Sequence, residues 1–458
     1  MPLLERFQEV NRARLPLSDR YLVGYSGGPD STALLHLMVR AGYPVVAAHL
    51  HHGMRPEADE EANRAEAWAK SLGVQILIGH ADVPTISSHR KIGIEEAGRE
   101  ARYEFFRQAS AAFGCDRIAT AHTLDDHVET ILFQMTRGGG LAALTGIPFA
   151  RDALVRPLLE FTKADLRAYC GEHELWFHDD PANTDVSSSR VRIRSQVLPA
   201  LTAINPRALE TFARTAETAR EENEYLDEIG AAVLEQTYVP LNGELEFLTQ
   251  ADELALNSEI LRQFPAVARA RAVRRGAQLV GVTLEHQATQ FALHGLMSGG
   301  AGALDVTKDF RIAWQPDRFQ LMRTDPVSVA RHPLEMPGVT ESEVFGWRFE
   351  ISLGDPSGPL PVETRLEARA DFNSLSGPLH VRAAADQDKM TPLGMPEGSK
   401  FVREILAEMK LTPRARRLLP IVCDMVGPVW VPGGPLAERV RLGPASKCAV
   451  VLRFGSMD

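Results

Sequence analysis

Residues 21–31 read YLVGYSGGPDS, and this stretch decides the fold of the first part of the chain. Leu22, Val23 and Tyr25 predict a short buried strand. The run from Ser26 to Ser31 breaks that strand, and a helix is expected over residues 32–40. Free N–H groups at a helix start, together with the helix dipole, favour an anion. The stretch therefore predicts a phosphate-binding turn, and an ordinary glycine-rich turn is the alternative.

Known phosphate-binding patterns narrow the class of this turn. The sequence lacks both the G-x-x-x-x-G-K-[ST] of P-loop NTPases and the G-x-G-x-x-G of dinucleotide folds. The six residues SGGPDS instead resemble the SGGxDS loop of the N-type ATP pyrophosphatases. That resemblance implies cleavage of ATP between its α and β phosphates and adenylation of a substrate.

Length and composition set outer bounds on the class of protein. The chain has 458 residues, enough for about three domains. Its four cysteines lie far apart, which argues against a disulfide framework, a zinc site or an iron–sulfur site and predicts a cytoplasmic location. No apolar run is long enough for a transmembrane helix, and residues 1–14 lack the apolar region of a signal peptide. The net charge of -10 argues mildly against nucleic acid unless basic residues cluster.

Strands and helices are expected to alternate after the turn. This alternation predicts a parallel α/β sheet with helices on both faces and ligands at the carboxyl ends of the strands. The expected elements are strands over residues 45–49, 74–79 and 117–120, and helices over residues 57–72, 95–113, 124–136 and 162–173.

Two polar segments leave their roles open. His49, His51 and His52 have no known zinc spacing, so they are expected to form hydrogen bonds rather than to ligate a metal. Arg99 and Arg102 share one face of the expected helix over residues 95–113. Arg102 is either a solvated arginine or a clamp for phosphate or carboxylate.

Residues 120–130 hold three acids at the start of an expected helix. Thr123 and Asp126 fit a capping box, which would explain one acid. Asp125 and Glu129 are not explained by the cap, and clustered carboxylates suit Mg²⁺ or an ammonium substrate. The cluster therefore predicts a functional site.

Basic residues and glycines mark later segments. Residues 137–146 form a glycine-rich loop that could act as a lid, and Arg190, Arg192 and Arg194 form a local basic patch. Arg190 and Arg194 would share a helix face. Alternating residues over 305–314 and 318–323 predict a β-hairpin.

The motifs, in this order and spacing, resemble the tRNA(Ile)-lysidine synthetase family. The match covers residues 21 to about 206 and includes SGGPDS, H-x-H-H-G-x-R, R-x-x-R-Y-x-F-F, T-A-H-x-x-D-D-x-x-E-T, R-P-L-L and D-D-P-x-N-x-D. G-S-K, P-R-x-R-R and W-x-P-G after residue 397 resemble the C-terminal domain of longer members. The chain departs from the family's usual residues at His127 (Gln), Ala182 (Ser), Val191 (Asn), Phe401 and Pro435.

This resemblance implies a domain organisation. The expected fold is an α/β, parallel-sheet N-type ATP pyrophosphatase (adenine nucleotide alpha hydrolase-like) domain, a mostly helical domain and a small α+β C-terminal domain. The expected boundaries are 1–206 for the catalytic domain, 207–325 for the helical tRNA- or substrate-binding domain, 326–385 for a linker with connecting strands, and 386–458 for the C-terminal tRNA-binding domain.

The resemblance also implies a ligase reaction. L-lysine would be joined to C2 of the wobble cytidine of tRNA(Ile) with a CAU anticodon, through an adenylated tRNA, with release of AMP and pyrophosphate. ATP and Mg²⁺ are the expected co-substrate and metal ion. The expected assignments are Ser26, Gly27, Gly28, Pro29, Asp30, Ser31, His49 and His122 for ATP; Asp30 and Asp125 for Mg²⁺; Asp126 and Glu129 for lysine; Asp30, Arg102, Asp126 and Glu129 for catalysis; and Arg190, Arg192, Arg194, Lys400, Arg414, Arg416 and Arg417 for tRNA.

Two other functions stay open at this point. A tRNA thiolase also adenylates a base, but it would need an iron–sulfur cluster or a sulfur carrier such as Cys115. A non-catalytic adenine-nucleotide-binding module would leave the acids at 125, 126 and 129 without a role. The family resemblance is the only ground for expecting a homodimer, and no membrane partner is expected.

Overall fold

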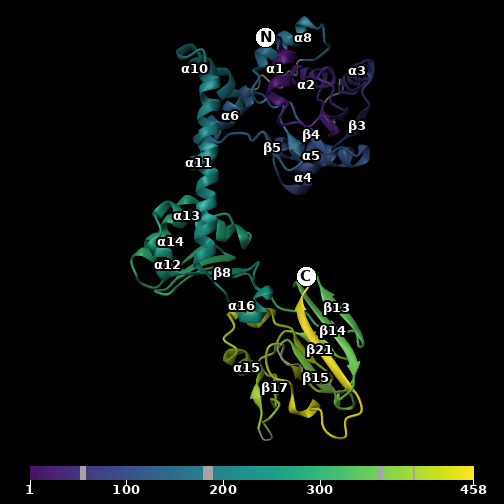
Figure 1. Cartoon of the computed structure of the whole chain (residues 1–458), viewed down its shortest axis with the longest axis vertical. Coiled ribbons are helices and arrows are strands. Elements are labelled where there is room, and N and C mark those ends of the chain that lie inside the picture. Colours follow the sequence, from purple (N-terminus) through teal and green to yellow (C-terminus); the bar gives the residue numbers. More distant parts are fainter. Residues whose placement is uncertain (52–57, 179–188, 358–364, 396–397, 458) are drawn as a thin grey trace. The chain divides into compact units, whose positions relative to one another are not determined.

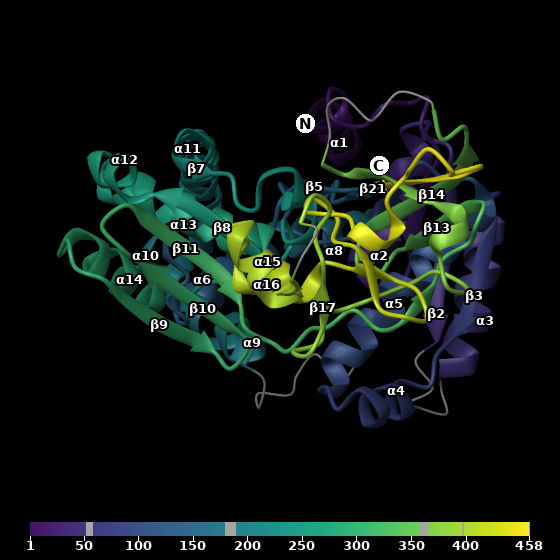
Figure 2. The same ribbon diagram turned by 90° about the horizontal axis from the view of Figure 1, so that it is seen from below.

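The computed structural model describes residues 1–51, 58–178, 189–357, 365–395 and 398–457, without the side chains of residues 58, 59 and 61 (Figures 1 and 2). The chain forms two compact units, Met1–Glu224 and Tyr225–Asp458. Helix α11 (Ala208–Thr237) contains the boundary between them. The four-part division expected from the sequence stays a prediction. No helix in the described part of the chain is long and apolar enough to cross a membrane.

The first unit is built on a six-stranded sheet in the order β3-β2-β1-β4-β6-β5. Five strands are parallel, and only β5 runs antiparallel to its neighbour β6. The parallel α/β prediction is therefore confirmed. The strands are β1 (Tyr21–Gly24), β2 (Val45–His51), β3 (Ile76–His80), β4 (Arg117–Ala119), β5 (Ala150–Arg151) and β6 (Leu154–Val155).

Helices cover both faces of this sheet (Figure 1). Tyr21 and Val23 of β1 point into a core shared with α1, α2 and α8, whereas Leu22 points into a core shared with Phe106 of α5. This alternation is the period of two that a strand imposes. The helices are α1 (Leu3–Asn11), α2 (Pro29–Arg40), α3 (Ala58–Ser71), α4 (Val83–Arg90), α5 (Ile94–Phe113), α6 (Leu124–Met135), α7 (Gly140–Leu144), α8 (Lys163–Glu172), α9 (Ser189–Arg192) and α10 (Leu198–Ile204).

Most expected element bounds hold within two residues, except that α2 begins at Pro29 and not at residue 32, and the two-residue extension of β2 is informative. The expected strand ends at residue 49, but β2 continues to His51, which pairs with His80 of β3. His49 lies in the strand as expected, whereas the expectation that His51 lies beyond the strand is wrong. Main-chain groups of β3 provide the hydrogen-bond partners that extend β2. This pairing cannot be read from the local sequence.

The second unit begins with helices and an antiparallel sheet in the order β7-β8-β11-β10-β9. A hairpin is present, because β10 and β11 pair antiparallel, but the expected first strand over 305–314 is divided between β9 and β10, which also pair with each other. The elements are β7 (Tyr238–Val239), β8 (Glu253–Asn257), α12 (Ser258–Gln263), α13 (Ala266–Leu279), α14 (His286–Met297), β9 (Gly302–Thr307), β10 (Phe310–Trp314) and β11 (Arg318–Arg323).

The C-terminal part of the second unit is rich in β-structure. Its longest pairing joins β14 to β21, which also pairs with β15 on its other side (Figure 1). One core containing Trp347, Phe349 and Trp430 lies beneath these strands. The elements are β12 (His332–Pro333), β13 (Gly338–Ser342), β14 (Trp347–Gly354), β15 (Glu367–Asp371), β16 (His380–Arg382), β17 (Lys389–Met390), β18 (Lys400–Phe401), α15 (Val402–Glu408), α16 (Pro413–Leu418), β19 (Ile421–Cys423), β20 (Pro428–Trp430) and β21 (Ala449–Ser456).

Candidate active site

The turn after β1 is tied together by its own serines. Ser31 Oγ donates to the Gly28 carbonyl at 3.0 Å, accepts from the Ser26 N–H at 3.2 Å and lies 3.0 Å from Ser26 Oγ. Gly27 has φ +83°, a conformation that favours glycine, and a Cβ there would meet the His178 ring at 3.0 Å. Helix α2 then starts at Pro29 with Asp30 in its first turn. These contacts give the loop a defined shape at the N-terminus of α2, a place that favours an anion.

Two histidines lie at the carboxyl ends of β2 and β4, the strands on either side of β1. His49 Nδ1 in β2 lies 3.0 Å from the Tyr25 carbonyl oxygen, and His122 Nδ1 after β4 lies 2.9 Å from Thr120 Oγ1. Burial lowers the pKa of His122 to about 4, with nearby arginines adding to the shift and Asp126 opposing it. His122 is therefore neutral at pH 7 and can offer a hydrogen bond but no charge.

The expected capping box at the start of α6 is present. Asp126 Oδ2 accepts from the Thr123 N–H at 2.9 Å and from the Thr123 hydroxyl at 2.8 Å. Asp126 Oδ1 remains, and it lies 2.7 Å from Lys163 Nζ. Burial alone would raise the pKa of Asp126, but the Lys163 ammonium and the Thr123 donors outweigh it and hold that pKa below its usual range. Asp126 is thus an anion that also caps its helix.

Glu129, one turn further along α6, is held by Arg194. Arg194 Nε donates to Glu129 Oε1 at 2.6 Å and Nη2 donates to Oε2 at 2.9 Å, which is the two-pronged geometry of a strong pair. The Glu129 side chain is 4% exposed and that of Arg194 is 36% exposed. Arg194 lies in a π-helical turn, Ile193–Val197, a type of turn that occurs often at functional sites.

Lys163 completes a charged cluster that also contains Asp126, Glu129 and Arg194. The sequence motifs did not single out this lysine. Its backbone N–H donates to Asp125 Oδ2 at 2.9 Å while its ammonium contacts Asp126. Burial raises the pKa of Asp30 to about 6, with Asp125 and Asp126 adding to the shift and Lys163 and Arg194 opposing it. A usable signal was present, because a lysine at the first position of a helix is disfavoured by the helix dipole and needs another reason.

Arg102 does not join this cluster through any contact in the described part of the chain. It lies on α5 with an exposed side chain, while the neighbouring Arg99 stacks over the Tyr103 ring at 5.2 Å. The two alternatives for Arg102, solvated arginine or anion clamp, are not separated by these contacts, and its catalytic role stays a prediction.

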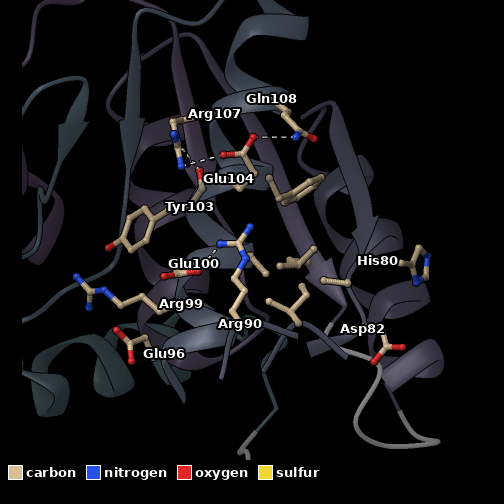
Figure 3. A pocket seen from close by; sticks show the side chains of 15 residues that line it. His80, Asp82, Arg90, Glu96, Arg99, Glu100, Tyr103, Glu104, Arg107 and Gln108 are labelled. Carbon is tan, nitrogen blue, oxygen red and sulfur yellow. Dashed lines mark hydrogen bonds and ion pairs between the residues drawn. The ribbon is translucent and has the colours of Figure 1, made fainter. Parts of the chain in front are cut away.

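A cavity of about 790 Å³ lies beside α4 and α5 rather than at the charged cluster (Figure 3). Arg90, Arg99 and Arg107 line it together with four acids, and Arg90 pairs with Glu100. Its lining contains neither the turn after β1 nor the acids of α6. Because the four acids offset the positive charge of the arginines, the lining does not favour the binding of a polyanion.

Among the expected tRNA contacts of the first unit, Arg190 and Arg192 are exposed and Arg194 is partly buried. Arg190 lies over the Phe133 ring at 5.6 Å, and Arg192 donates to Ser189 Oγ at 3.4 Å. Phe133 and Glu129 are four residues apart and lie on one face of α6. Arg190, which lies over Phe133, and Arg194, which pairs with Glu129, therefore contact the same face of that helix. Two of the sequence motifs fall partly or wholly outside the described residues, at residues 52–55 and 179–185. The second range includes Ala182.

The four expected tRNA contacts of the second unit divide by burial. Arg414 is 9% exposed, donates to Asp252 Oδ2 at 2.9 Å and reaches the Asp325 carbonyl at 2.6 Å. Lys400 pairs with Glu408 at 2.8 Å, and Arg416 donates to the Leu411 carbonyl at 3.0 Å. Arg417 is exposed. Arg414 therefore ties segments of its own unit together, and Arg417 is the member best placed for a ligand.

His127 explains one departure from the family pattern. Its Nδ1 accepts from the Ile147 N–H at 3.0 Å, and its ring packs where a Cβ on Gly146 would fall. Burial lowers the pKa of His127 to about 4, helped by Arg220. A neutral His127 thus fixes the segment after α7 and leaves the acids of α6 untouched.

The donor set fits magnesium only together with a phosphate. Within the described residues, no group of three or more His, Cys, Asp or Glu side chains is arranged to hold a metal ion. Mg²⁺ usually binds one or two carboxylates along with substrate phosphates and water. Asp30 and Asp125, which interact electrostatically, fit that mode of binding.

The fold and the turn define the class first. A model of the PP-loop domain family matches residues 4–201, which contain the parallel sheet, the turn after β1 and the charged cluster. Curated relatives then extend the match to nearly the whole chain. A tRNA(Ile)-lysidine synthase of Symbiobacterium thermophilum is 31% identical over 98% of this chain and 97% of its own length.

Two further relatives agree. The tRNA(Ile)-lysidine synthases of Solibacter usitatus and Dehalococcoides mccartyi are 31% and 29% identical and cover 96% and 95% of this chain, and 98% and 95% of their own lengths. The chain belongs to the tRNA(Ile)-lysidine synthase family. The family predicted from the motifs is thereby confirmed.

Proposed function

We propose that this chain is an ATP-dependent ligase that joins L-lysine to C2 of the wobble cytidine of tRNA(Ile) with a CAU anticodon. The observation that carries the proposal is the charged cluster of Asp126, Glu129, Lys163 and Arg194 in a PP-loop domain of this family. The cluster combines carboxylates for an amine with cations for phosphate. A product with altered base pairing would change the codon and amino-acid specificity of the tRNA.

The first step would take place at the turn of residues 26–31. The O2 atom of cytosine attacks the α-phosphorus of ATP, and pyrophosphate leaves. Main-chain N–H groups of the turn and the start of α2 would hold the departing phosphates. Mg²⁺ carried on the phosphates would bind Asp30, with Asp125 nearby, and would offset the charge of the leaving group.

The second step would take place at α6. The ε-amine of lysine attacks C2, the C2–O bond breaks, and AMP leaves with that oxygen. The amine arrives as an ammonium ion because its usual pKa is ~10.4, so it must be bound as a cation and then lose a proton. Asp126 is the anion best suited to that binding, with Glu129 one turn away. Arg194, whose guanidinium is partly exposed, is placed to meet a carboxylate or a phosphate.

The thiolase alternative is disfavoured by the cysteines. All four are free, and burial raises the pKa of Cys115 and raises that of Cys170 to about 11. A sulfur carrier has to react as a thiolate, and a raised pKa works against that form. A non-catalytic nucleotide-binding module would leave the anionic Asp126 and its neighbours without a substrate.

Release of AMP tests the proposal. The purified chain is incubated with labelled ATP, Mg²⁺, L-lysine and tRNA(Ile) carrying a CAU anticodon, and each component is omitted in turn. We expect AMP to accumulate with the complete mixture and lysine to appear in the tRNA. Turnover that needs neither lysine nor tRNA would contradict the proposal, and transfer of sulfur in place of lysine would favour the thiolase.

A further inference from the structure

Arg194 Nη2 lies 3.7 Å from Asp126 Oδ1, and the ammonium group of Lys163 is the cation in direct contact with that oxygen. Its Nζ lies 2.7 Å from Asp126 Oδ1, and the two side chains are 28% and 23% exposed. The other oxygen of Asp126 is filled by the two Thr123 donors. Lys163 opens α8, where the helix dipole repels a cation, so its position is held by the carboxylate and not by its helix.

A substrate ammonium would need the same oxygen. Both oxygens of Glu129 already accept from Arg194, so Glu129 offers no simpler place. Two ammonium groups on one carboxylate oxygen would repel each other at close range. In this arrangement the chain's own lysine side chain therefore stands where the substrate's side chain would bind.

A second anionic position lies within electrostatic reach of Lys163. Asp30 lies in the first turn of α2, and the Lys163 cation is among the charges that act on it. Helix α8 packs against α2, and the Cys170 thiol donates to the Pro29 carbonyl at 3.5 Å. Phosphates bound at the turn would attract Lys163, because lysine is a flexible point charge that binds phosphate well.

We propose that Lys163 is a positioning residue that blocks Asp126 in the absence of nucleotide and moves to the phosphates when ATP binds, which opens Asp126 to the substrate amine. Lysine binding would then depend on nucleotide binding, and the two substrates would bind with positive coupling. The inference rests on the proposed function, because it assumes that Asp126 receives the substrate amine.

Equilibrium binding of L-lysine to the full chain tests the coupling. Affinity is measured by calorimetry with and without a non-hydrolysable ATP analogue and Mg²⁺, for the wild type and for Lys163→Met. We expect the analogue to strengthen lysine binding to the wild type by about tenfold, within the usual range of coupling between sites. In Lys163→Met, lysine should bind without the analogue, and the coupling factor should fall to about one.

Two further variants separate blocking from general charge or folding effects. Lys163→Arg keeps a movable cation and should retain nucleotide-dependent lysine binding. Lys70→Met removes another lysine whose ion pair is also 2.7 Å long, with Glu66 on α3, and should leave both affinities unchanged. Thermal melting checks that each variant is folded.

The kinetic consequence is a split between substrates. Lys163→Met should raise the KM for ATP by about tenfold, since a phosphate contact is lost, while the KM for lysine does not rise. Nucleotide-independent lysine binding in the wild type, or an unchanged coupling factor in Lys163→Met, would overturn the inference while AMP release with lysine and tRNA still supported the proposed function. Absence of that AMP release in the wild type would remove the proposed function itself.

Discussion

Arg194 and Arg414 lie in basic segments of similar appearance, yet the fold gives them opposite surroundings. In the pair Arg194–Glu129 the carboxylate is buried at 4% exposure and the arginine is 36% exposed. In the pair Arg414–Asp252 the arginine is buried at 9% exposure and the carboxylate is 22% exposed. A partly exposed guanidinium keeps one side for a ligand, whereas a buried one is neutralised inside the fold. Burial of the cation thus separates an arginine that can still meet a ligand from one that is paired inside the fold.

The largest effect is expected at Asp126, whose carboxylate oxygen Oδ1 lies 3.7 Å from Arg194 Nη2. Asp126→Ala should reduce lysine incorporation by at least about 100-fold, because the amine loses its anion, while tRNA binding is kept. Transfer of labelled lysine and a filter-binding assay measure the two properties.

The chain supplies a matched control for Asp126. Asp165 closes the same type of capping box with Thr162 at the start of α8. Asp165→Ala should destabilise the fold by about 1 kcal/mol, as loss of a cap does, and leave lysine transfer nearly intact. Equal losses of activity in the two variants would mean that Asp126 acts only as a cap.

The next largest effect would sharpen the structural side of the comparison. Arg414→Ala should lower the free energy of unfolding of the second unit by about 2–4 kcal/mol, because Asp252 loses its buried partner. Urea denaturation measures this change. The exposed neighbour Arg417→Ala should stay within about 0.5 kcal/mol of the wild type.

For tRNA binding we expect the opposite order, with the larger effect in Arg417→Ala and the smaller in Arg414→Ala. Arg417→Ala should reduce the dependence of tRNA affinity on salt by about one released ion, and folded Arg414→Ala should not. A normal salt dependence in Arg417→Ala would remove α16 from the proposed tRNA surface.

Arginine-to-lysine exchanges probe the geometry of both pairs. Arg194→Lys keeps the charge but loses the two-pronged contact with Glu129, and we expect lysine transfer to fall by about tenfold with a small change in stability. Arg414→Lys should change stability and leave transfer nearly unaltered. Steady-state kinetics and denaturation of both variants measure this crossover, and an identical pattern in both would break the comparison.

The smallest effect concerns His127, which is buried against a main-chain donor and not against a carboxylate. Its pKa of about 4 lies below the usual value, so the unfolded chain takes up a proton between pH 6.5 and 4 that the folded chain does not. The histidine therefore stabilises the fold above pH 6.5, and this contribution is lost as the pH falls toward 4.

Replacement of His127 tests that sign. In His127→Gln the free energy of unfolding, followed by thermal melting, should fall less steeply between pH 6.5 and 4, by at most ~1.4 kcal/mol per pH unit for one proton. His36 and His122 also have pKa values of about 4 and should keep part of the decline in both proteins. Parallel melting curves across that range would show that His127 is not the group that titrates.

Local interactions were predictable from the residues. The turn at residues 26–31, the start of α6 and the capping box of Thr123 with Asp126 are formed by groups three to five positions apart. Apolar runs likewise predicted four of the five parallel strands, but not β6, and β2 gained two residues through its partner β3. The motif order was specific enough to indicate the family.

Contacts between distant residues were not predictable. Lys163 reaches Asp126 across 37 positions, Arg194 reaches Glu129 across 65, and Arg414 reaches Asp252 across 162. A basic segment looks the same in the sequence whether its arginine is exposed or buried. The extent of desolvation that decides between ligand contact and internal pairing depends on which distant elements pack together.

The sequence by itself determined the phosphate turn, the helix that presents the acids and the family, because each depends on neighbouring residues or on ordered motifs. Only the tertiary structure decided that Lys163 pairs with Asp126, that Arg194 pairs with Glu129 and that Arg414 is buried. The physical reason is that charge pairing acts through space over a few ångströms, and folding brings distant residues to that range.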